Sequence, residues 1–172
     1  MYEKTTESLR SWSSGRILCY FYERILPEGA TITTIENYAP RIAEAKKNFK
    51  RAGKENQITL LEGDANDILK TLEPSYDMIF MDAAKGQYIH FFPEIMRLLA
   101  KDGLLISDNV LQDGDVVQSR YGVTRRNRTI HSRMREYLYT LKNIDELETV
   151  ILPVGDGVTV STRVEKKATK RN

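Results

Sequence analysis

Two acidic positions, each at the end of an apolar run, are the residues of this sequence best suited to metal chemistry. Asp82 follows the run at 78–81, and Asp108 with Asn109 follows the run at 104–107. Continuous apolar runs of this length are typical of strands buried in parallel sheets. Two carboxylates and an amide at the ends of such strands are hard oxygen ligands suited to Mg²⁺. The alternative is that Asp82 caps the next helix and that Asp108 and Asn109 form a turn.

The elements around these positions predict an α/β fold. Residues 88–100 carry apolar side chains at helical spacing, which makes a strand–helix–strand crossover with the two runs. The order of elements indicates a mostly parallel sheet with a C-terminal antiparallel hairpin, in a single domain at 27–166. The same patterns predict strands at 31–35, 58–61, 148–154 and 157–164, and helices at 17–26, 39–52, 66–72 and 128–141. Residues 1–26 form an aberrant N-terminal segment, and 167–172 a disordered tail.

Two further acidic residues follow predicted strands. Glu36 ends the strand at 31–35, where a dinucleotide-type fold places an acid to bind ribose hydroxyls; the alternative is a surface charge. Asp64 follows Gly63 after the strand at 58–61. It could accept a hydrogen bond from an adenine amino group, or cap the helix at 66–72.

Composition restricts the class of protein. The formal net charge is only +2, so bulk charge gives no argument for a nucleic-acid partner. A single cysteine, Cys19, excludes an intrachain disulfide and fits a reducing compartment. No apolar run approaches the roughly 20 residues of a membrane span, so we expect a soluble, cytoplasmic protein without membrane contact.

Six segments together resemble the class I S-adenosylmethionine (SAM)-dependent O-methyltransferases, within the cation-dependent group that includes caffeoyl-CoA and catechol O-methyltransferases. The bacterial members that methylate 5-hydroxyuridine in tRNA are the most similar. The segments are L-P-E-G-A-T-I-T-T-I-E at 26–36, E-G-D-A at 62–65, F-M-D-A-A-K-G-Q-Y at 80–88, L-I-S-D-N-V-L at 105–111, R-T-I-H-S-R-M-R-E-Y at 128–137 and L-P-V-G-D-G-V at 152–158. The resemblance implies a Rossmann-like class I methyltransferase fold and SAM as cofactor.

The resemblance also implies the cofactor contacts. Glu36 would hold the ribose, and Asp64 and Ala65, following Gly63, would contact the adenine. Asp82 would lie near the methionine end of the cofactor.

A cation site and a base are implied as well. Asp82, Asp108 and Asn109 would ligate Mg²⁺ or a similar divalent cation. Lys85 follows Asp82 by three residues, as the proposed general base does in catechol O-methyltransferase. A lysine beside a metal in a partly dry pocket loses its proton more easily. The alternative is a solvated lysine that pairs with Asp82.

Arginines between residues 120 and 135 suggest an RNA partner. Arg120, Arg125, Arg126 and Arg128 would contact phosphates if the acceptor is tRNA, although a solvated helix face is the commoner meaning of such a run. The resemblance further implies a homodimer.

The roles of three further side chains near this region, two tyrosines and a histidine, remain open. Tyr88 and Tyr121 could stack on a flipped base or only pack. His131 is expected on the helix at 128–141 as a partner or surface residue with no catalytic role.

The N-terminal region departs from the family pattern. Relatives carry a first strand and a glycine-rich loop, E-I-G-x-x-x-G-Y-S-A, before the position of Leu26, as well as an N-terminal helical segment. Here the region has one glycine, Gly15, and no apolar strand before it, so we expect the fold to be N-terminally incomplete, without its central first strand. Residues 12–21 can be encoded by a DNA sequence that, after the loss of one nucleotide, encodes G-A-A-G-G-Y-S-A-I, which matches the missing loop. Our hypothesis is that the segment before Pro27 is out of frame, and we expect weak SAM binding.

Four functions therefore remain open. The leading one is an O-methyltransferase acting on 5-hydroxyuridine in tRNA. The second is a non-catalytic remnant that binds RNA or a partner through residues 120–135, and the third is an O-methyltransferase of a small catechol-like substrate. A nucleotide-dependent dehydrogenase is disfavoured, because the chain lacks G-x-G-x-x-G.

Overall fold

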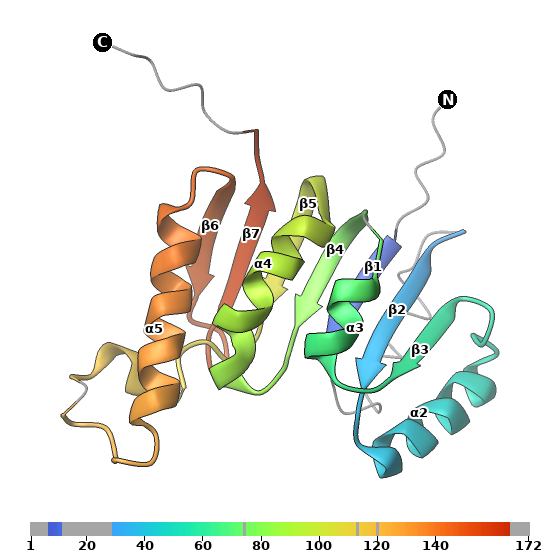
Figure 1. Ribbon diagram of the computed structural model, residues 1–172, viewed down its shortest axis with the longest axis horizontal. Coiled ribbons are helices and arrows are strands. Elements are labelled where there is room, and N and C mark those ends of the chain that lie inside the picture. Colours follow the sequence, from blue (N-terminus) through green and yellow to red (C-terminus); the bar gives the residue numbers. More distant parts are fainter. Residues whose placement is uncertain (1–6, 12–28, 74, 113, 120, 166–172) are drawn as a thin grey trace.

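The computed structural model describes residues 7–11, 29–73, 75–112, 114–119 and 121–165. Within these residues, seven strands form one sheet in the order β3-β2-β1-β4-β5-β7-β6 (Figure 1). Strands β1 to β5 pair in parallel, whereas β7 runs antiparallel to both β5 and β6. The predicted α/β fold is confirmed. The strands are β1 (Glu7–Ser11), β2 (Thr31–Glu36), β3 (Ile58–Glu62), β4 (Tyr76–Met81), β5 (Leu99–Ser107), β6 (Leu147–Leu152) and β7 (Val158–Arg163).

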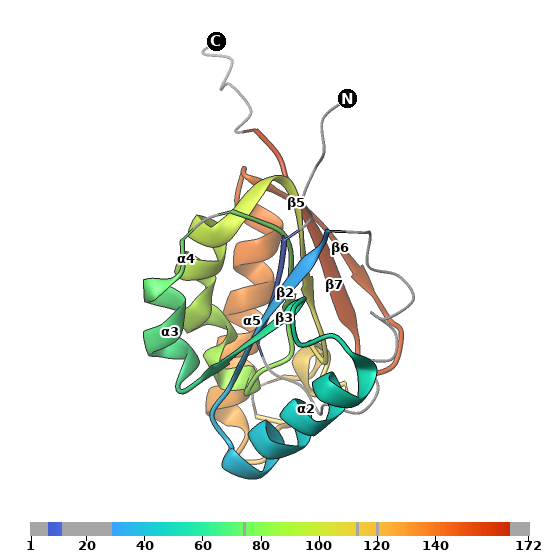
Figure 2. The same ribbon diagram turned by 90° about the vertical axis from the view of Figure 1, so that its right-hand side faces the viewer.

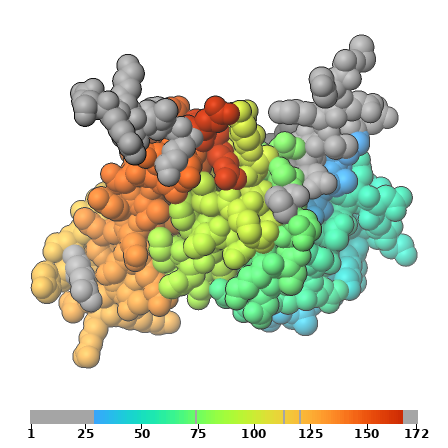
Figure 3. All heavy atoms as spheres, turned by 45° about the horizontal axis from the view of Figure 1, so that its top comes forward, coloured from blue at the N-terminus to red at the C-terminus, as the bar shows by residue number. Residues whose placement is uncertain are grey.

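The helices cover the two faces of the sheet unequally. Figure 2 shows α3, α4 and α5 on one face and α2 on the other, and Figure 3 shows the surfaces of α5, α4 and α3 side by side. The α-helices are α2 (Ala39–Ala52), α3 (Ala65–Thr71), α4 (Tyr88–Leu98) and α5 (Arg128–Asn143), with short 3₁₀ turns η1 (Lys85–Gln87) and η2 (Asp115–Val117). The predicted helix at 17–26 lies outside the described residues.

The central position of the parallel sheet is filled, which corrects our expectation of a missing first strand. Residues Glu7–Ser11 lie between β2 and β4, with Ser8 beside Ile32 on one side and Met78 on the other. An apolar strand was expected at this central position. However, the edges of β2 and β4 present backbone donors and acceptors that a five-residue polar segment can satisfy as well as an apolar one.

The boundary between α4 and β5 also differs from the prediction. The helix expected at 88–100 ends at Leu98, and β5 begins at Leu99, which pairs with Tyr76 of β4. Leu99 and Ala100, which continue the apolar helical pattern, therefore belong to β5 and not to α4. Arg163 of β7 stabilises this junction, because its Nη1 donates to the carbonyl oxygens of Met96, at 2.7 Å, and Leu99.

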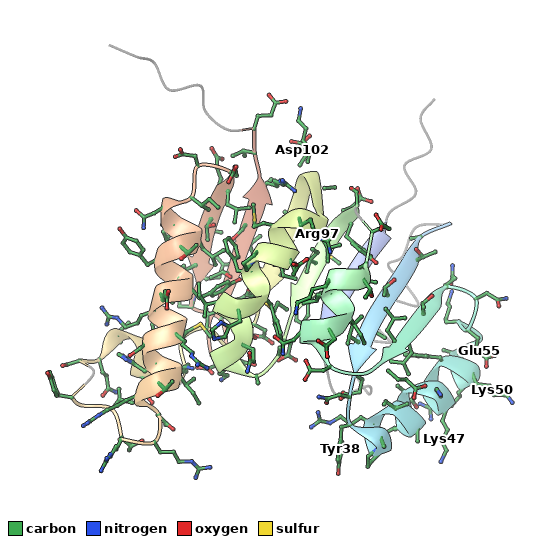
Figure 4. The ribbon with its side chains drawn as sticks, viewed as in Figure 1. Tyr38, Lys47, Lys50, Glu55, Arg97 and Asp102 are labelled. Atoms are coloured by element: carbon green, nitrogen blue, oxygen red, sulfur yellow. The ribbon has the colours of Figure 1, made fainter. Side chains whose placement is uncertain are left out.

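A second arginine stabilises the end of α3. Figure 4 labels Arg97 on α4, beside α3. Its Nη2 donates to Leu69 O at 2.8 Å and its Nη1 to Leu72 O at 2.9 Å. These carbonyls lie at the C-terminal end of α3 and have no partner within the helix, so Arg97 joins α3 to α4.

Helix α5 packs on the sheet with a slightly different face from the one predicted. Met134, Leu138 and Leu141 are buried as expected, but Ile130 is 38% exposed. His131 takes the inward position instead, with 2% exposure, so its expected surface location is wrong. Hydrophobicity alone favours Ile130 at the inward position. However, helical geometry at this end of α5 points His131 toward the loop that precedes the helix.

Candidate active site

Glu36 is a buried carboxylate at the carboxyl end of β2. Its side chain is held by the start of the next segment, because Oε1 accepts from the backbone N–H of Asn37 and of Tyr38, each at 2.9 Å. Its second oxygen, Oε2, lies 3.8 Å from Arg41 Nη1 of α2. Burial therefore fixes the orientation of the carboxylate, and the interpretation of Glu36 as a solvated surface charge is wrong.

Asp64 lies at the end of the neighbouring strand β3 and caps α3. Its Oδ1 accepts from Asn66 N and Asn66 Nδ2, both at 2.8 Å. The backbone hydrogen bond from Asn66, followed by the side-chain bond, lowers the pKa of Asp64 below its ordinary value. The capping alternative is thus confirmed, and the cap holds Asp64 as an anion facing the same cavity as Glu36.

One cavity of about 370 Å³ joins Glu36, Gly63, Asp64 and Ala65, four of the five residues predicted to contact the cofactor, whereas Asp82 is not among its lining residues. It lies between the carboxyl ends of β2 and β3 and the loop after β4, the position at which open α/β sheets bind ligands. The lining residues are Ile35, Glu36, Asn37, Gly63, Asp64, Ala65, Asn66, Ala83, Ala84, Gln87 and Phe91. Gly63, with φ 149°, makes the turn that leads from β3 to Asp64.

Asp82 and Asp108 follow adjacent strand ends. Met81 and Ser107, which precede them, are register partners in β4 and β5, and Asp108 N donates to Met81 O at 3.0 Å. Asn109 has φ 53° and donates its N–H to Asp108 Oδ1 at 2.7 Å, so the turn interpretation holds for this pair. The N-cap residues of η1 and α4 are Ala84 and Gln87, so Asp82 does not occupy the N-cap position of either.

These three side chains are the candidates for a divalent cation. Across the described residues, no group of three or more His, Cys, Asp or Glu side chains is placed to hold a metal ion. The candidate set has two carboxylates and one amide, all hard oxygen donors. The pKa of Tyr88 is raised chiefly by burial, then by the charge of Asp82, and also by Asp108. Both carboxylates thus lie near one buried hydroxyl, and two carboxylates with one amide are a donor set that suits a hard divalent cation, so the donor chemistry fits.

Lys85 pairs with Asp156, not with Asp82. Its Nζ lies 3.0 Å from Asp156 Oδ2, and the two side chains are 33% and 17% exposed. Asp156 belongs to the turn between β6 and β7, which is bonded to the segment after Asn109 through Leu111 N to Asp156 O at 2.9 Å. Asp156 was not among the site residues predicted from the sequence. The signal that could have identified it was the G-D-G triplet at 155–157, whose glycines both adopt positive φ.

Gly157 is required for this turn. Its φ is 81°, and a Cβ there would lie 2.2 Å from Leu111 Cγ. We expect Gly157→Ala to lower the free energy of unfolding by about 2–4 kcal/mol, measured by urea denaturation. Gly155→Ala is the matched control: φ is 57° but nothing lies within 4 Å, so we expect a loss of only about 1–2 kcal/mol. Equal losses would show that the Leu111 contact is unimportant.

The arginines of the predicted RNA surface divide into two groups. Arg125 and Arg126 are exposed, in the loop between η2 and α5. Arg128 donates from Nε to Val123 O at 3.3 Å and so holds the loop, while Arg120 lies outside the described residues. Two further arginines, 133 and 135, donate to backbone carbonyls of Gly86, Val116 and Gln118.

The two tyrosines considered for base stacking have opposite environments. Tyr121 is 87% exposed beside the arginine loop. Tyr88 is fully buried, so stacking on a base is excluded for it, and its ring packs edge-on against Tyr137 at 5.5 Å. No helix in the described parts of the chain is both long and apolar enough to cross a membrane.

Comparison with known proteins identifies the family. A family model described as O-methyltransferase matches residues 20–164. The caffeoyl-CoA O-methyltransferase of Citrus natsudaidai is 33% identical over 136 residues, which are 75% of this chain and 57% of that protein. The catechol O-methyltransferase of Niastella koreensis is 38% identical over 98 residues, or 55% of this chain and 44% of that protein. The chain spans between 44% and 61% of the length of the first curated relatives.

A solved structure agrees with this. The SAH-bound methyltransferase PaMTH1 of Podospora anserina superposes with a TM-score of 0.80 at 26% identity, covering 92% of this chain and 71% of that one. The family model covers 145 of the 172 residues of this chain, from 20 to 164 inclusive. The chain therefore belongs to the O-methyltransferase family, within its caffeoyl-CoA and catechol O-methyltransferase-like group.

Proposed function

We propose that this chain is built for SAM-dependent, cation-assisted methyl transfer to a hydroxyl oxygen. The proposal rests on two pairs of acidic residues that lie at the same edge of the sheet. Glu36 and Asp64 face one cavity, and Asp82 and Asp108 follow the adjacent strand ends at the same edge of the sheet. A nucleoside and a charged reacting centre could therefore be bound side by side.

The cavity residues suit the adenosine part of SAM. Glu36 presents a fixed carboxylate, and carboxylates accept hydrogen bonds from ribose hydroxyls. Asp64, kept anionic by its cap, is an acceptor suited to an exocyclic amino group, and Phe91 and Ala83 supply an apolar wall. Asp82 follows β4 directly beside Ala83, so it would lie toward the methionine portion.

The second set suits the reacting oxygen. SAM, when bound, supplies a sulfonium methyl group, and a divalent cation, when bound, lowers the pKa of the acceptor hydroxyl and directs its oxygen. Asp82, Asp108 and Asn109 would hold that cation. Lys85 would have to lose one proton to solvent and leave Asp156 before its Nζ could take the acceptor proton, because only the neutral amine is a base. The pair with Asp156 holds Nζ in a fixed position.

For the acceptor, we propose a 5-hydroxyuridine in tRNA. Support comes from the sequence resemblance and from the exposed loop that carries Arg125, Arg126, Val117 and Tyr121, which joins β5 to α5 at the edge of the sheet where β4 and β5 end (Figure 1). Arginines contact phosphates and exposed aromatic rings stack on bases. The second candidate acceptor is a small catechol-like hydroxyl, favoured by the catechol O-methyltransferase relative.

Glu36→Gln tests the cofactor site. We expect SAM affinity to fall about 10- to 100-fold, because a hydrogen bond to a charged group contributes about 1.5–3 kcal/mol. The measurement is calorimetry with SAM. Glu44→Gln, at an exposed position on α2, is the control and should leave the affinity unchanged. An unaltered affinity in Glu36→Gln would remove the ribose assignment.

The double variant Arg125→Gln, Arg126→Gln tests the RNA acceptor. We expect the dependence of log Kd for unmodified tRNA on log salt to become shallower by about 0.7–0.9 for each lost phosphate contact. Lys47→Gln, Lys50→Gln is the control of equal charge, on α2 at the other side of the molecule (Figure 4). Methylation of catechol but not of tRNA, with equal salt slopes in both double variants, would favour the small acceptor.

A further inference from the structure

The buried hydroxyl of Tyr88 lies at the junction of the two strand ends that carry the candidate cation ligands. It donates toward Asp108 O at 2.9 Å and Met81 O at 3.2 Å, and it accepts from Ala83 N at 3.3 Å. Met81 and Ala83 flank Asp82 on its two sides. A single hydroxyl therefore contacts the backbone on both sides of Asp82 and the backbone of Asp108 itself.

The position of this hydroxyl is fixed from the other end of the side chain. Tyr88 begins α4, is fully buried, and packs edge-on against Tyr137 of α5 at 5.5 Å between ring centroids. The hydroxyl is thereby held against the carbonyl oxygens of Met81 and Asp108 at the strand ends. The geometry thus connects the helix layer to the strand ends through one hydrogen-bonded group.

We propose that Tyr88 is a positioning residue that sets the separation of Asp82 and Asp108 and thereby the affinity of the site for a divalent cation. This inference rests on the proposed cation site. Without the hydroxyl, Asp108 O and Ala83 N lose their contact with α4, and the two turns that carry the carboxylates are joined only through strand pairing and the bond from Asp108 N to Met81 O. Groups that orient metal ligands in this way commonly change affinity 10- to 100-fold when they are removed.

The chain offers a close control in Tyr137. This tyrosine is also fully buried, and its hydroxyl lies 2.6 Å from Ser107 Oγ, one residue before Asp108. Among the described residues, this hydroxyl forms its hydrogen bond with the side chain of Ser107 and with neither Asp108 nor the backbone beside Asp82. Tyr88→Phe and Tyr137→Phe therefore each remove one buried hydroxyl, and only the first removes the bonds between α4 and the two turns.

The experiment measures Mn²⁺ binding by calorimetry to the full chain and to both variants. We expect Tyr88→Phe to weaken Mn²⁺ binding about 10- to 100-fold and Tyr137→Phe to leave it near that of the unchanged chain. Thermal unfolding should show similar, small losses of Tm in both. In parallel, hydrogen exchange should accelerate at the amide of Ala83 in Tyr88→Phe alone.

Three outcomes would overturn the inference. Equal Mn²⁺ affinities in the two variants, with accelerated exchange at Ala83, would mean that the hydroxyl fixes the backbone but does not govern the cation. Unchanged exchange would mean that it does not fix the backbone. Failure of the unchanged chain to bind Mn²⁺ would remove the cation site itself, whereas SAM binding that depends on Glu36 would still support the cofactor part of the proposed function.

Discussion

A chain with its reading frame restored across residues 12–21 is expected to bind SAM at least about 100-fold more tightly than the chain as given. The restored segment reads G-A-A-G-G-Y-S-A-I, whereas the present one, W-S-S-G-R-I-L-C-Y-F, has one glycine. Glycines allow the backbone to approach the methionine carboxylate closely, and two backbone N–H donors to a carboxylate contribute about 3–6 kcal/mol together. Calorimetry with SAM on both chains measures the difference.

A control separates the loop from a general gain in stability. In the restored chain, replacing the Gly-Gly pair by Val-Val should return the affinity to that of the chain as given, while the far-ultraviolet circular dichroism spectrum stays the same. Micromolar binding by the chain as given would contradict the prediction, and would mean that the Glu36 cavity suffices. Absence of binding in both chains would favour the non-catalytic remnant.

The fold could be predicted from the sequence wherever side-chain patterning controls it. The apolar runs at 78–81 and 104–107 are strands because both faces of the central sheet are covered, and the helices at 39–52 and 128–141 begin where predicted. β1 could not be predicted. Its five residues, E-S-L-R-S, do not show the apolar pattern of a strand. Their position depends on backbone hydrogen bonds with the edges of β2 and β4.

The candidate site was predictable in part for the same reason. Glu36, Asp64, Asp82 and Asp108 all follow strands, and the carboxyl ends of parallel strands meet at one edge, so a linear pattern is enough to bring them together. The pairing of Asp156 with Lys85 was not predictable, because Asp156 reaches the site from an antiparallel turn 71 residues after Lys85. Sequence spacing carries no information on which turn faces which strand end.

The roles of the buried side chains of Tyr88 and His131 also could not be predicted from the pattern of apolar and polar residues. Tyr88 and His131 have types common at surfaces and interfaces, and no sequence pattern favours stacking over packing for Tyr88. Their burial follows from how α4 and α5 contact each other and the loop before α5. Tyr88 was considered for the acceptor and instead lies behind the strand ends, where it can act only through the backbone.

Asp108→Asn is expected to lower methyl transfer by at least about 100-fold in the restored chain. The substitution keeps the size of the side chain and its acceptor for the Asn109 amide, but removes one of the two negative charges at the ends of β4 and β5. The cation would then be held by a single carboxylate, and the acceptor oxygen would lose both its direction and its lowered pKa. The measurement is transfer of a labelled methyl group from SAM to unmodified tRNA and to catechol, over a range of Mg²⁺ concentrations.

Asp102→Asn is the matched control on the same strand. Asp102 is exposed near the far end of β5 (Figure 4) and has φ 61°, a conformation that asparagine tolerates as well as aspartate. We expect it to leave transfer unchanged, and SAM affinity should be the same in all three chains because the Glu36 cavity is intact. If Asp108→Asn transferred methyl groups as fast as Asp102→Asn at every Mg²⁺ concentration, the strand-end carboxylates would not hold a catalytic cation. Asp108 would then serve the turn with Asn109 alone, and removal of the acceptor proton would depend on Lys85 without a cation.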